Sequence, residues 1–531
     1  MLLYDMLKTH AQFDAKIPAM YYMGKYFSYE TLYRSIDDAA ARLSAFVKAG
    51  DVATICMPNT PECVYCFYAL NRLGAVAHMV HPLAPKSQLK KFMAAAKSKV
   101  LITLSINLEK YSEIAKDVPI VSIHPARSLP GIMRVLFDIK TKPYKGDMTN
   151  IIPFDKLDAS SLPEKVERDD NETGVYLHSG GTGGEPKIIE LSDRSINCLA
   201  ARGLNILGIE NGVGTYMLAA LPMFHGFGLA MSIHTILCHG AVSVMMPKFD
   251  PKTTVKLLKK NKMHYIIGVP NLFRALLKQK DFRGDALKNL FIGFVGGDCA
   301  PQDLLDEFNS HMEAAGAKGR LFEGYGLTET VTVCALNNYA HSRRTSMGMM
   351  LDGLTAAIVE PDGVTPLPPG EKGEIVIAGD TLMNGYLNNP EENEKVFFDI
   401  DGVRYVRTGD FGYMDEDGFL YFVQRLKRII KIAGISVYPK EIESSALEIA
   451  GVTGSCAVEY KDNGKTKIAL FLTGAAQDEN EVKAKIESDL SHYAVPTIVR
   501  VIDAIPVTPV MKADTIALTA EAEKIARGEI S

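Results

Sequence analysis

One nine-residue segment, Ser179-Gly-Gly-Thr-Gly-Gly-Glu-Pro-Lys187, combines four glycines with two hydroxyls and a lysine. It follows the apolar run 174–177, so the order predicts a strand that leads directly into a polar loop. Glycines let backbone N–H groups turn toward an anion, while the hydroxyls and Lys187 add donors and positive charge. These properties suit a triphosphate, and a plain glycine-rich turn is the alternative. The segment is not a Walker A loop, because Gly-x-x-x-x-Gly-Lys-Ser/Thr is absent and Pro186 precedes the lysine.

Four further motifs follow this loop along the chain. They are Phe322-Glu-Gly-Tyr-Gly-Leu-Thr-Glu-Thr330, Tyr405-Val-Arg-Thr-Gly-Asp-Phe-Gly412, the segment from Arg425 through Gly434 to Glu443, and Pro506-Val-Thr-Pro-Val-Met-Lys512. In type and order the five motifs resemble those of the adenylate-forming superfamily, which includes acyl-CoA synthetases, peptide-synthetase adenylation domains and firefly luciferase. They extend from residue 179 to residue 512 and therefore cover most of the chain.

The resemblance implies a fold and an activity. The expected fold is a large N-terminal α/β domain over 1–424, with parallel sheets and a smaller antiparallel or barrel-like piece, and a small mobile α+β lid over 425–531. The expected activity is that of an AMP-forming acid–thiol ligase, which uses Mg²⁺ and ATP to adenylate a largely apolar fatty or aryl acid and passes the acyl group to CoA. A free-standing adenylation enzyme that loads a carrier protein, and a non-catalytic nucleotide- or acyl-binding relative, are the alternatives.

The resemblance also implies a role for each motif residue. Lys512, Thr328 and Glu329 are the expected catalytic residues, Glu329 is also the expected Mg²⁺ ligand, and Lys427 is the expected hinge. His225, Phe224 and Val269 are expected in the acid pocket. The residues expected to contact ATP or CoA are Ser179, Gly180, Gly181, Thr182, Gly183, Gly184, Lys187, Gly297, Asp298, Gly324, Tyr325, Gly326, Asp410, Arg425, Lys431 and Gly434.

Three positions depart from the family pattern. Gly183 stands where relatives usually carry a hydroxyl or another side chain, which removes one donor at a cost of roughly 1 kcal/mol. Met511 replaces the usual glycine before the catalytic lysine, so the geometry of that loop differs from the family pattern. Asp193 stands where many relatives carry histidine, and the sequence gives it no role.

The elements around the motifs indicate α/β architecture. Apolar runs at 52–57, 264–270 and 291–296 alternate with helical stretches, which is typical of buried parallel strands. The runs 373–378 and 418–423 resemble an antiparallel piece. Runs at 455–460 and 466–471 flank an Asn-Gly pair, a strong hairpin signal, and a helix with apolar residues at helical spacing follows.

Composition excludes several classes of protein. The 531 residues carry a net charge of −5 and no dense basic run, so nucleic acid is not an expected partner. The start of the chain lacks the pattern of a signal peptide. Eight cysteines in so long a chain do not make a disulfide framework, and Cys63 and Cys66 are expected to be buried structural thiols on one helix. A reduced, cytoplasmic protein is expected.

One segment, 128–142, mixes apolar residues with basic ones. It is expected either to lie on a membrane surface as an interfacial helix or to pack as an excursion on its own domain.

Overall fold

The computed structural model describes residues 1–9, 14–179, 186–432, 435–462, 464–475, 478–507 and 513–530. Gly180–Gly184, Gly434, Met511 and Lys512, which the sequence assigns to the site, lie outside these ranges. The chain forms two compact units. The first contains Met1–Ser179, Lys187–Thr355 and Ala378–Phe398, and the second contains Pro186, Ala356–Ile377 and the described residues from Asp399 onward. A boundary at residue 425 therefore stays a prediction.

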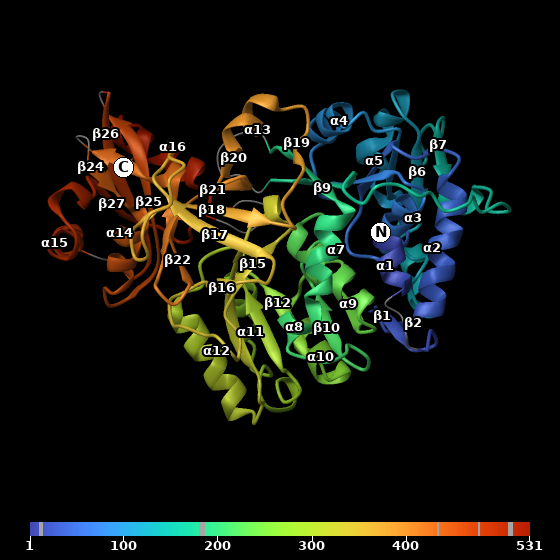
Figure 1. The fold of residues 1–531 in the computed structure, drawn as a ribbon, viewed down its shortest axis with the longest axis horizontal. Helices are drawn as coiled ribbons and strands as arrows, with labels where there is room; N and C mark the ends of the chain where they lie inside the picture. The colour runs from blue at the N-terminus through green and yellow to red at the C-terminus, as the bar shows by residue number, and fades with distance from the viewer. Residues whose placement is uncertain are drawn as a thin grey trace. The chain divides into compact units, whose positions relative to one another are not determined.

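The first unit contains a largely parallel sheet whose strands carry the predicted phosphate loop. β3 to β6 and β8 are joined by parallel pairs, and β9 pairs antiparallel with both β8 and β19. The strand order is β19 (Gly385–Tyr386), β9 (Ile188–Ser192), β8 (Thr173–His178), β4 (Val76–Met79), β3 (Val52–Cys56), β5 (Val100–Leu104), β6 (Ile120–Ile123) and β7 (Ile151–Pro153). The expected strand before the loop and the strand expected at 52–57 are both present (Figure 1).

A second sheet in this unit places the other nucleotide motif. Its central strands pair in parallel and its ends pair antiparallel. The order is β16 (Gly348–Met350), β15 (Val333–Leu336), β14 (Arg320–Gly326), β13 (Ile292–Val295), β12 (Tyr265–Gly268), β10 (Tyr216–Ala219), β11 (Val242–Met245), β1 (Pro18–Tyr22) and β2 (Lys25–Ser28). The parallel pair β12–β13 confirms the prediction for the two apolar runs at 264–270 and 291–296.

Helices of the first unit pack on these sheets. α3 is buried along its whole length, so Cys63 and Cys66 are buried free thiols, as predicted. The bounds are α1 (Leu3–Thr9), α2 (Tyr29–Leu43), α3 (Pro61–Arg72), α4 (Lys86–Ala95), α5 (Leu108–Tyr111), α6 (Gly131–Lys140), α7 (Asp193–Ala201), α8 (Gly203–Leu207), α9 (Ile236–Cys238), α10 (Pro251–Asn261), α11 (Pro270–Leu277), α12 (Gln302–Ala314) and α13 (Pro390–Val396).

The second unit begins with an antiparallel piece. β21 pairs antiparallel with β22, which confirms the antiparallel arrangement expected near 418–423. The strands that lie wholly or partly in this unit are β17 (Leu354–Val359), β18 (Gly373–Gly379), β20 (Phe397–Ile400), β21 (Val403–Met414) and β22 (Phe419–Arg425), followed by the short hairpin of β23 (Ile430–Ile432) and β24 (Ile435–Val437).

The remainder of the second unit is a small α+β structure. β25 (Val452–Asp462) and β26 (Lys465–Gly474) form the predicted hairpin, and β27 (Ile498–Val501) adds to β26 in parallel. Apolar residues of α14 (Pro439–Leu447) and α15 (Glu479–Asp489) pack with β26 in one buried cluster, while α16 (Thr515–Ala526) joins a second cluster with β25. A large N-terminal α/β part and a smaller C-terminal α+β part are thus confirmed.

Over the described ranges, the structure has no helix with the length and apolar content that a membrane span requires.

Candidate active site

The ends of the predicted phosphate loop are joined by two hydrogen bonds, one between backbone groups and one from the backbone to a side chain. The Ser179 N–H donates to the Lys187 carbonyl at 2.9 Å, and the Lys187 N–H donates to Ser179 Oγ at 3.0 Å. Because β8 and β9 pair antiparallel on either side, the loop is the connection of a β-hairpin. Ser179 therefore closes the base of the loop, and Lys187 starts its return into the sheet.

Lys187 is held by an acid and an aromatic ring. Its ammonium forms an ion pair with Glu392 on α13 and lies 4.4 Å from the centre of the Tyr386 ring. The hydrogen bond from Lys187 is the largest cause that lowers the pKa of the Glu392 carboxyl below its usual range. A carboxylate and a π face together hold the Lys187 ammonium at the end of the loop, where an anion can meet it.

Tyr386 connects this lysine to the expected metal ligand. The Tyr386 hydroxyl donates to Glu329 Oε1 at 2.9 Å, and the Met383 N–H donates to the Glu329 carbonyl at 2.8 Å. Tyr386 is placed by β19, which pairs with β9 directly after the loop. The order Glu392–Lys187–Tyr386–Glu329 is one continuous network of side chains within the first unit.

Glu329 lies in a strained turn. Residues Thr328–Thr330 form one 3₁₀ turn, and Val331 follows it with φ +68° and ψ −58°. The Thr332 N–H donates to the Thr330 carbonyl at 2.8 Å, which makes a γ-turn of the rare positive-φ kind. Such a conformation at a β-branched residue costs on the order of 1–3 kcal/mol. This strained residue lies two positions after the expected metal ligand, and strained backbone of this kind clusters at functional sites.

The acid-pocket segment contacts this turn. A Cβ atom at Gly226 would lie 1.8 Å from the Val331 carbonyl oxygen, so only glycine fits there. The preceding His225 is half-buried, and its ring centre lies 4.6 Å from that of Phe224. A buried π-helical stretch, Phe227–Thr235, follows. The close contact at Gly226 brings the His225 segment next to the Thr328–Glu329 motif.

The ends of two neighbouring strands meet beside Tyr325. β13 ends at Val295 and Gly296–Gly297 follow it, and a Cβ at Gly296 would lie 3.0 Å from the Gly324 carbonyl oxygen. Gly297 has φ +80°, and a Cβ there would lie 3.4 Å from Cγ1 of Val269. Tyr325 itself is buried. The structure thus groups these expected nucleotide residues with the expected acid-pocket valine.

Gly326 and Asp298 are two further residues that are expected to contact the nucleotide. Gly326 closes β14 against the Thr332 carbonyl. Asp298 is exposed, and its carboxylate accepts the Cys299 N–H at 2.9 Å.

Three histidines that sequence reasoning missed adjoin the loop and pocket. His178 directly precedes Ser179, and its Nε2 shares a 2.9 Å hydrogen bond with Nε2 of His78. Burial, and then the charge of His225, lower the pKa of His178 to about 4. The third, His81, has its ring centre 4.5 Å from that of Phe224. The position of His178 beside the glycine-rich loop was the signal that could have identified it.

In the second unit, Asp410 and Arg425 form a pair across β21 and β22. They are opposite each other in the strand register, and Arg425 Nε lies 2.9 Å from Asp410 Oδ1. Asp410 is 1% exposed, so its charge depends on such a partner. The structure places these two expected ribose-binding residues together.

The expected hinge residue Lys427 is exposed in the 3₁₀ turn Leu426–Arg428 that follows β22. Its neighbour Arg428 pairs with Glu443 of α14 at 2.5 Å. Lys431 is exposed in the middle of β23.

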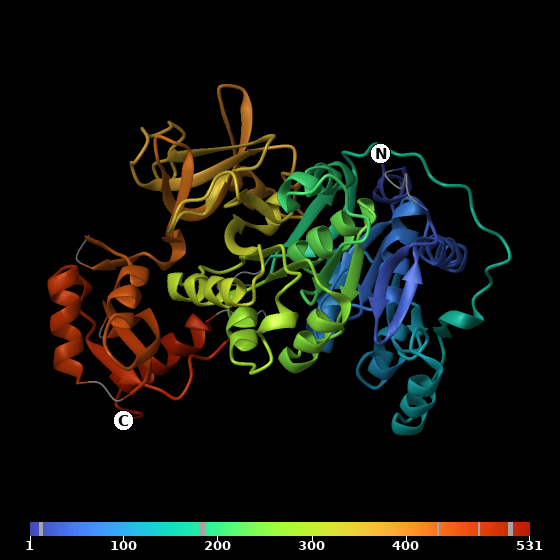
Figure 2. The ribbon, with the colours of Figure 1, turned by 90° about the horizontal axis from the view of Figure 1, so that it is seen from below.

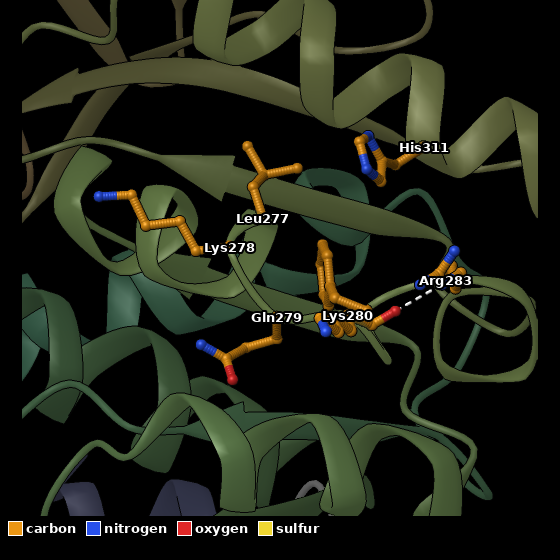
Figure 3. Close-up of a pocket in the computed structure, with 7 residues that line it drawn as sticks. Leu277, Lys278, Gln279, Lys280, Arg283 and His311 are labelled. Atoms are coloured by element: carbon orange, nitrogen blue, oxygen red, sulfur yellow. Dashed lines mark hydrogen bonds between the residues drawn. The ribbon is translucent and has the colours of Figure 1, made fainter. Parts of the chain in front are cut away.

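A separate cavity of about 260 Å³ lies between the end of α11 and α12 in the first unit (Figure 3). Its polar lining includes Lys278, Lys280, Arg283 and His311, and Arg283 donates to the Lys280 carbonyl. None of the expected site residues that the structure describes lines it. The cavity therefore lies apart from the motif residues described above.

Comparisons with known proteins agree with the resemblance that these motifs indicate. A family model described as AMP-binding enzyme matches residues 7–387. A long-chain-fatty-acid–CoA ligase of Bacillus subtilis is 28% identical over 94% of this chain and 91% of its own length. A 4-coumarate–CoA ligase 2 of Nicotiana tabacum is 28% identical over 87% of this chain and 83% of its own. The crystal structure of ATP-bound MatB from Rhodopseudomonas palustris, at 22% identity, matches with a TM-score of 0.86 over 99% of this chain and 100% of that chain, which shows a shared fold.

Proposed function

The chain belongs to the AMP-binding enzyme family, within the adenylate-forming superfamily, and we propose that it is an ATP-dependent acyl-CoA synthetase. It joins a largely apolar carboxylic acid to CoA and releases AMP and pyrophosphate. Ligases of fatty and aryl acids with CoA are among its relatives over most of both chains, which supports this chemistry.

The observation that carries the proposal is the Glu392–Lys187–Tyr386–Glu329 network. It links the lysine expected at the β- and γ-phosphates to the carboxylate expected at Mg²⁺ through one tyrosine. A purely structural glycine-rich turn needs neither a cation at its base nor a nearby carboxylate in a strained turn. A site for a magnesium–triphosphate complex needs both.

The donor set fits Mg²⁺. Glu329 offers a half-buried carboxylate, and Tyr386 orients it through Oε1. A hard, small cation uses one or two protein carboxylates together with phosphate oxygens. When bound, Mg²⁺ would neutralise charge on the triphosphate.

In the first half-reaction the acid's carboxylate attacks the α-phosphorus of ATP, and pyrophosphate leaves. Lys187 and the loop hold the β- and γ-phosphates, Thr328 donates to the α-phosphate, and Lys512 offsets charge between the two reacting groups. Asp410 accepts hydrogen bonds from the ribose hydroxyls with Arg425 beside it, and Tyr325 packs on adenine. These groups lower the barrier by positioning two anions and compensating the charge that develops.

In the second half-reaction the thiol of CoA displaces AMP. The lid over 425–531 turns about Lys427, withdraws Lys512, and presents Lys431 and Gly434 to the pantetheine. Two half-reactions at one site need different groups at different times, and a hinge supplies that exchange.

The acid is proposed to be an apolar monocarboxylate. Phe224 is buried and Val269 is half-buried, and His225 and His81 are the polar rings beside Phe224. Each buried CH₂ of such an acid gains about 0.8 kcal/mol. A second substrate charge would remain unpaired in these surroundings.

Pyrophosphate release with a panel of fatty, aryl, dicarboxylic and amino acids, with and without CoA, tests the proposal. We expect release with fatty or aryl acids and acyl-CoA formation when CoA is added. Release without acyl-CoA would favour the carrier-loading alternative, and no release with any acid would favour the non-catalytic one.

The Lys512→Ala variant separates the half-reactions. Adenylation should fall steeply, while transfer from preformed acyl-adenylate to CoA stays near the wild-type rate. Equal losses in both steps would contradict the assigned role of Lys512.

A further inference from the structure

The helix α6 carries an apolar stripe that the protein leaves exposed. Ile132, Val135, Leu136 and Ile139 follow the i, i+3, i+4, i+7 spacing of one helix face. Their exposed fractions are 79%, 58%, 52% and 75%. α6 contributes no buried residue at all, and it stands out from the body of the first unit at the lower edge of Figure 2. A contiguous exposed apolar stripe of this kind marks an interaction surface.

The opposite face of α6 holds the helix to its unit. Asp138 Oδ1 lies 3.3 Å from Nε2 of His124, and the Phe137 ring lies edge-on to the His124 ring at 6.0 Å. Because successive residues are about 100° apart, Phe137 lies about 150° and Asp138 about 110° from the centre of the apolar stripe. The stripe therefore points away from the contact with His124.

Basic residues are concentrated in α6 and in the segment that directly follows it. Residues 131–145 contain four basic residues and one acidic residue, a net charge of +3 in a chain whose net charge is −5. The four are all exposed, and they are Arg134, Lys140, Lys142 and Lys145. An apolar face bordered by cations complements the boundary between anionic headgroups and acyl chains.

We propose that α6 docks this protein on the surface of an anionic lipid bilayer, with the apolar stripe in the headgroup–acyl boundary and the basic residues among the phosphates. A helix of ten residues is about 15 Å long and cannot span a bilayer. Pairing of two α6 stripes between copies would bring two +3 borders together, which opposes self-association. On the proposed function, docking also places the enzyme where apolar acids partition.

Vesicle sedimentation of the full-length protein tests the proposal directly. Wild type is mixed with phosphatidylcholine vesicles that either contain or lack phosphatidylglycerol. We expect binding to the anionic vesicles and at least tenfold less to the neutral ones. Equal binding to both, or none to either, would overturn the proposal.

The first set of variants replaces apolar residues of the stripe and, as a control, matched exposed apolar residues elsewhere in the chain. The triple variant Ile132→Ser, Leu136→Ser, Ile139→Ser should lose binding to anionic vesicles. The control triple Val364→Ser, Val403→Ser, Ile516→Ser changes exposed apolar side chains of the second unit and should bind like wild type. Equal binding by both triples would refute the role of α6.

The second set of variants replaces three lysines in or after α6 and, as a control, three lysines elsewhere in the chain. Each basic residue near an anionic surface contributes about fivefold in affinity, so removing three should weaken binding on the order of 100-fold. The triple variant Lys140→Gln, Lys142→Gln, Lys145→Gln should show this loss. The control triple Lys252→Gln, Lys256→Gln, Lys259→Gln changes exposed lysines of α10, removes the same charge and should leave binding near wild type. A similar loss in both triples would mean a response to net charge alone and would refute docking through α6.

Two readouts separate this proposal from its rivals and from the proposed function. Light scattering that shows a dimer abolished by the apolar triple, with no vesicle binding, would assign the stripe to a second copy instead. Pyrophosphate release with a water-soluble aryl acid should be the same for wild type and both α6 triples. Vesicle binding in a protein that activates no acid would leave docking intact and refute only the proposed function.

Discussion

The ion pair between Lys187 and Glu392 leads to a testable prediction for ATP binding. The lysine expected to meet the triphosphate is already neutralised by a carboxylate, so phosphate binding must displace Glu392 or share Lys187 with it. The variant Glu392→Gln removes this charge and keeps the side chain's size. We therefore expect tighter ATP binding in the variant.

The exposure of the pair sets the size of the effect. The Lys187 and Glu392 side chains are 30% and 34% exposed, so solvent screens the interaction. Pairs of this kind contribute about 0.2–1 kcal/mol. Release of that energy should lower the KM for ATP by about 1.4- to fivefold, since 1.4 kcal/mol corresponds to tenfold.

The assay is pyrophosphate release at saturating acid, with ATP varied. Glu394→Gln is the matched control, because it removes the same charge from an exposed position of the same helix α13. Its KM for ATP should stay near wild type. A higher KM for ATP in Glu392→Gln would refute the reasoning, since it would show that Glu392 positions Lys187 for the phosphates and does not compete with them.

Three further predictions address other parts of the site. Tyr386→Phe removes the hydrogen bond to Glu329. A hydrogen bond to a charged acceptor contributes about 1.5–3 kcal/mol. The Mg²⁺ concentration for half-maximal activity should therefore rise at least tenfold, while the KM for the acid stays constant. Asp410→Asn should raise the KM for ATP at least tenfold and leave the KM for acid unchanged, and an unaltered ATP dependence would make Asp410 structural. His178 has a folded-state pKa of about 4, below its usual value of about 6.5. Between these two pH values the unfolded state binds more protons than the folded state. The free energy of unfolding should therefore fall by about 3 kcal/mol as the pH drops from 6.5 to 4. Between pH 7 and 5 this loss amounts to about 2 kcal/mol, and denaturant titrations at these two pH values should show that His178→Gln lacks it.

Local sequence signals predicted much of the fold. The strand before the phosphate loop and the hairpin of β25 and β26 follow from apolar runs that end at turn residues, and both are present. The parallel pairing of β12 with β13 also agreed with buried apolar runs. The order of strands within each sheet was not predicted, because pairing depends on contacts between distant segments that no local pattern encodes.

The same limit applies to the site. Motif residues such as Lys187 and Glu329 were identified from their own neighbourhoods in the sequence, but their partners were not. Glu392 is 205 residues from Lys187, and Tyr386 is 57 residues from Glu329. β19 places Tyr386 beside β9, and α13 follows directly with Glu392. Only the pairing of a two-residue strand brings these partners to the loop, and nothing in the spacing signals it.

Val331 shows why one local rule fails at the site. A β-branched residue disfavours positive φ, so local preference alone favours an extended conformation at Val331. The structure instead bends it into a γ-turn, with Thr328–Glu329 on one side and the close contact to Gly226 on the other. The strain is maintained because the Thr330–Thr332 hydrogen bond and the packed glycine leave the backbone no relaxed alternative. The position that breaks the local rule is thus the one that fixes the expected metal carboxylate against the acid-pocket segment, as expected where function overrides local preference.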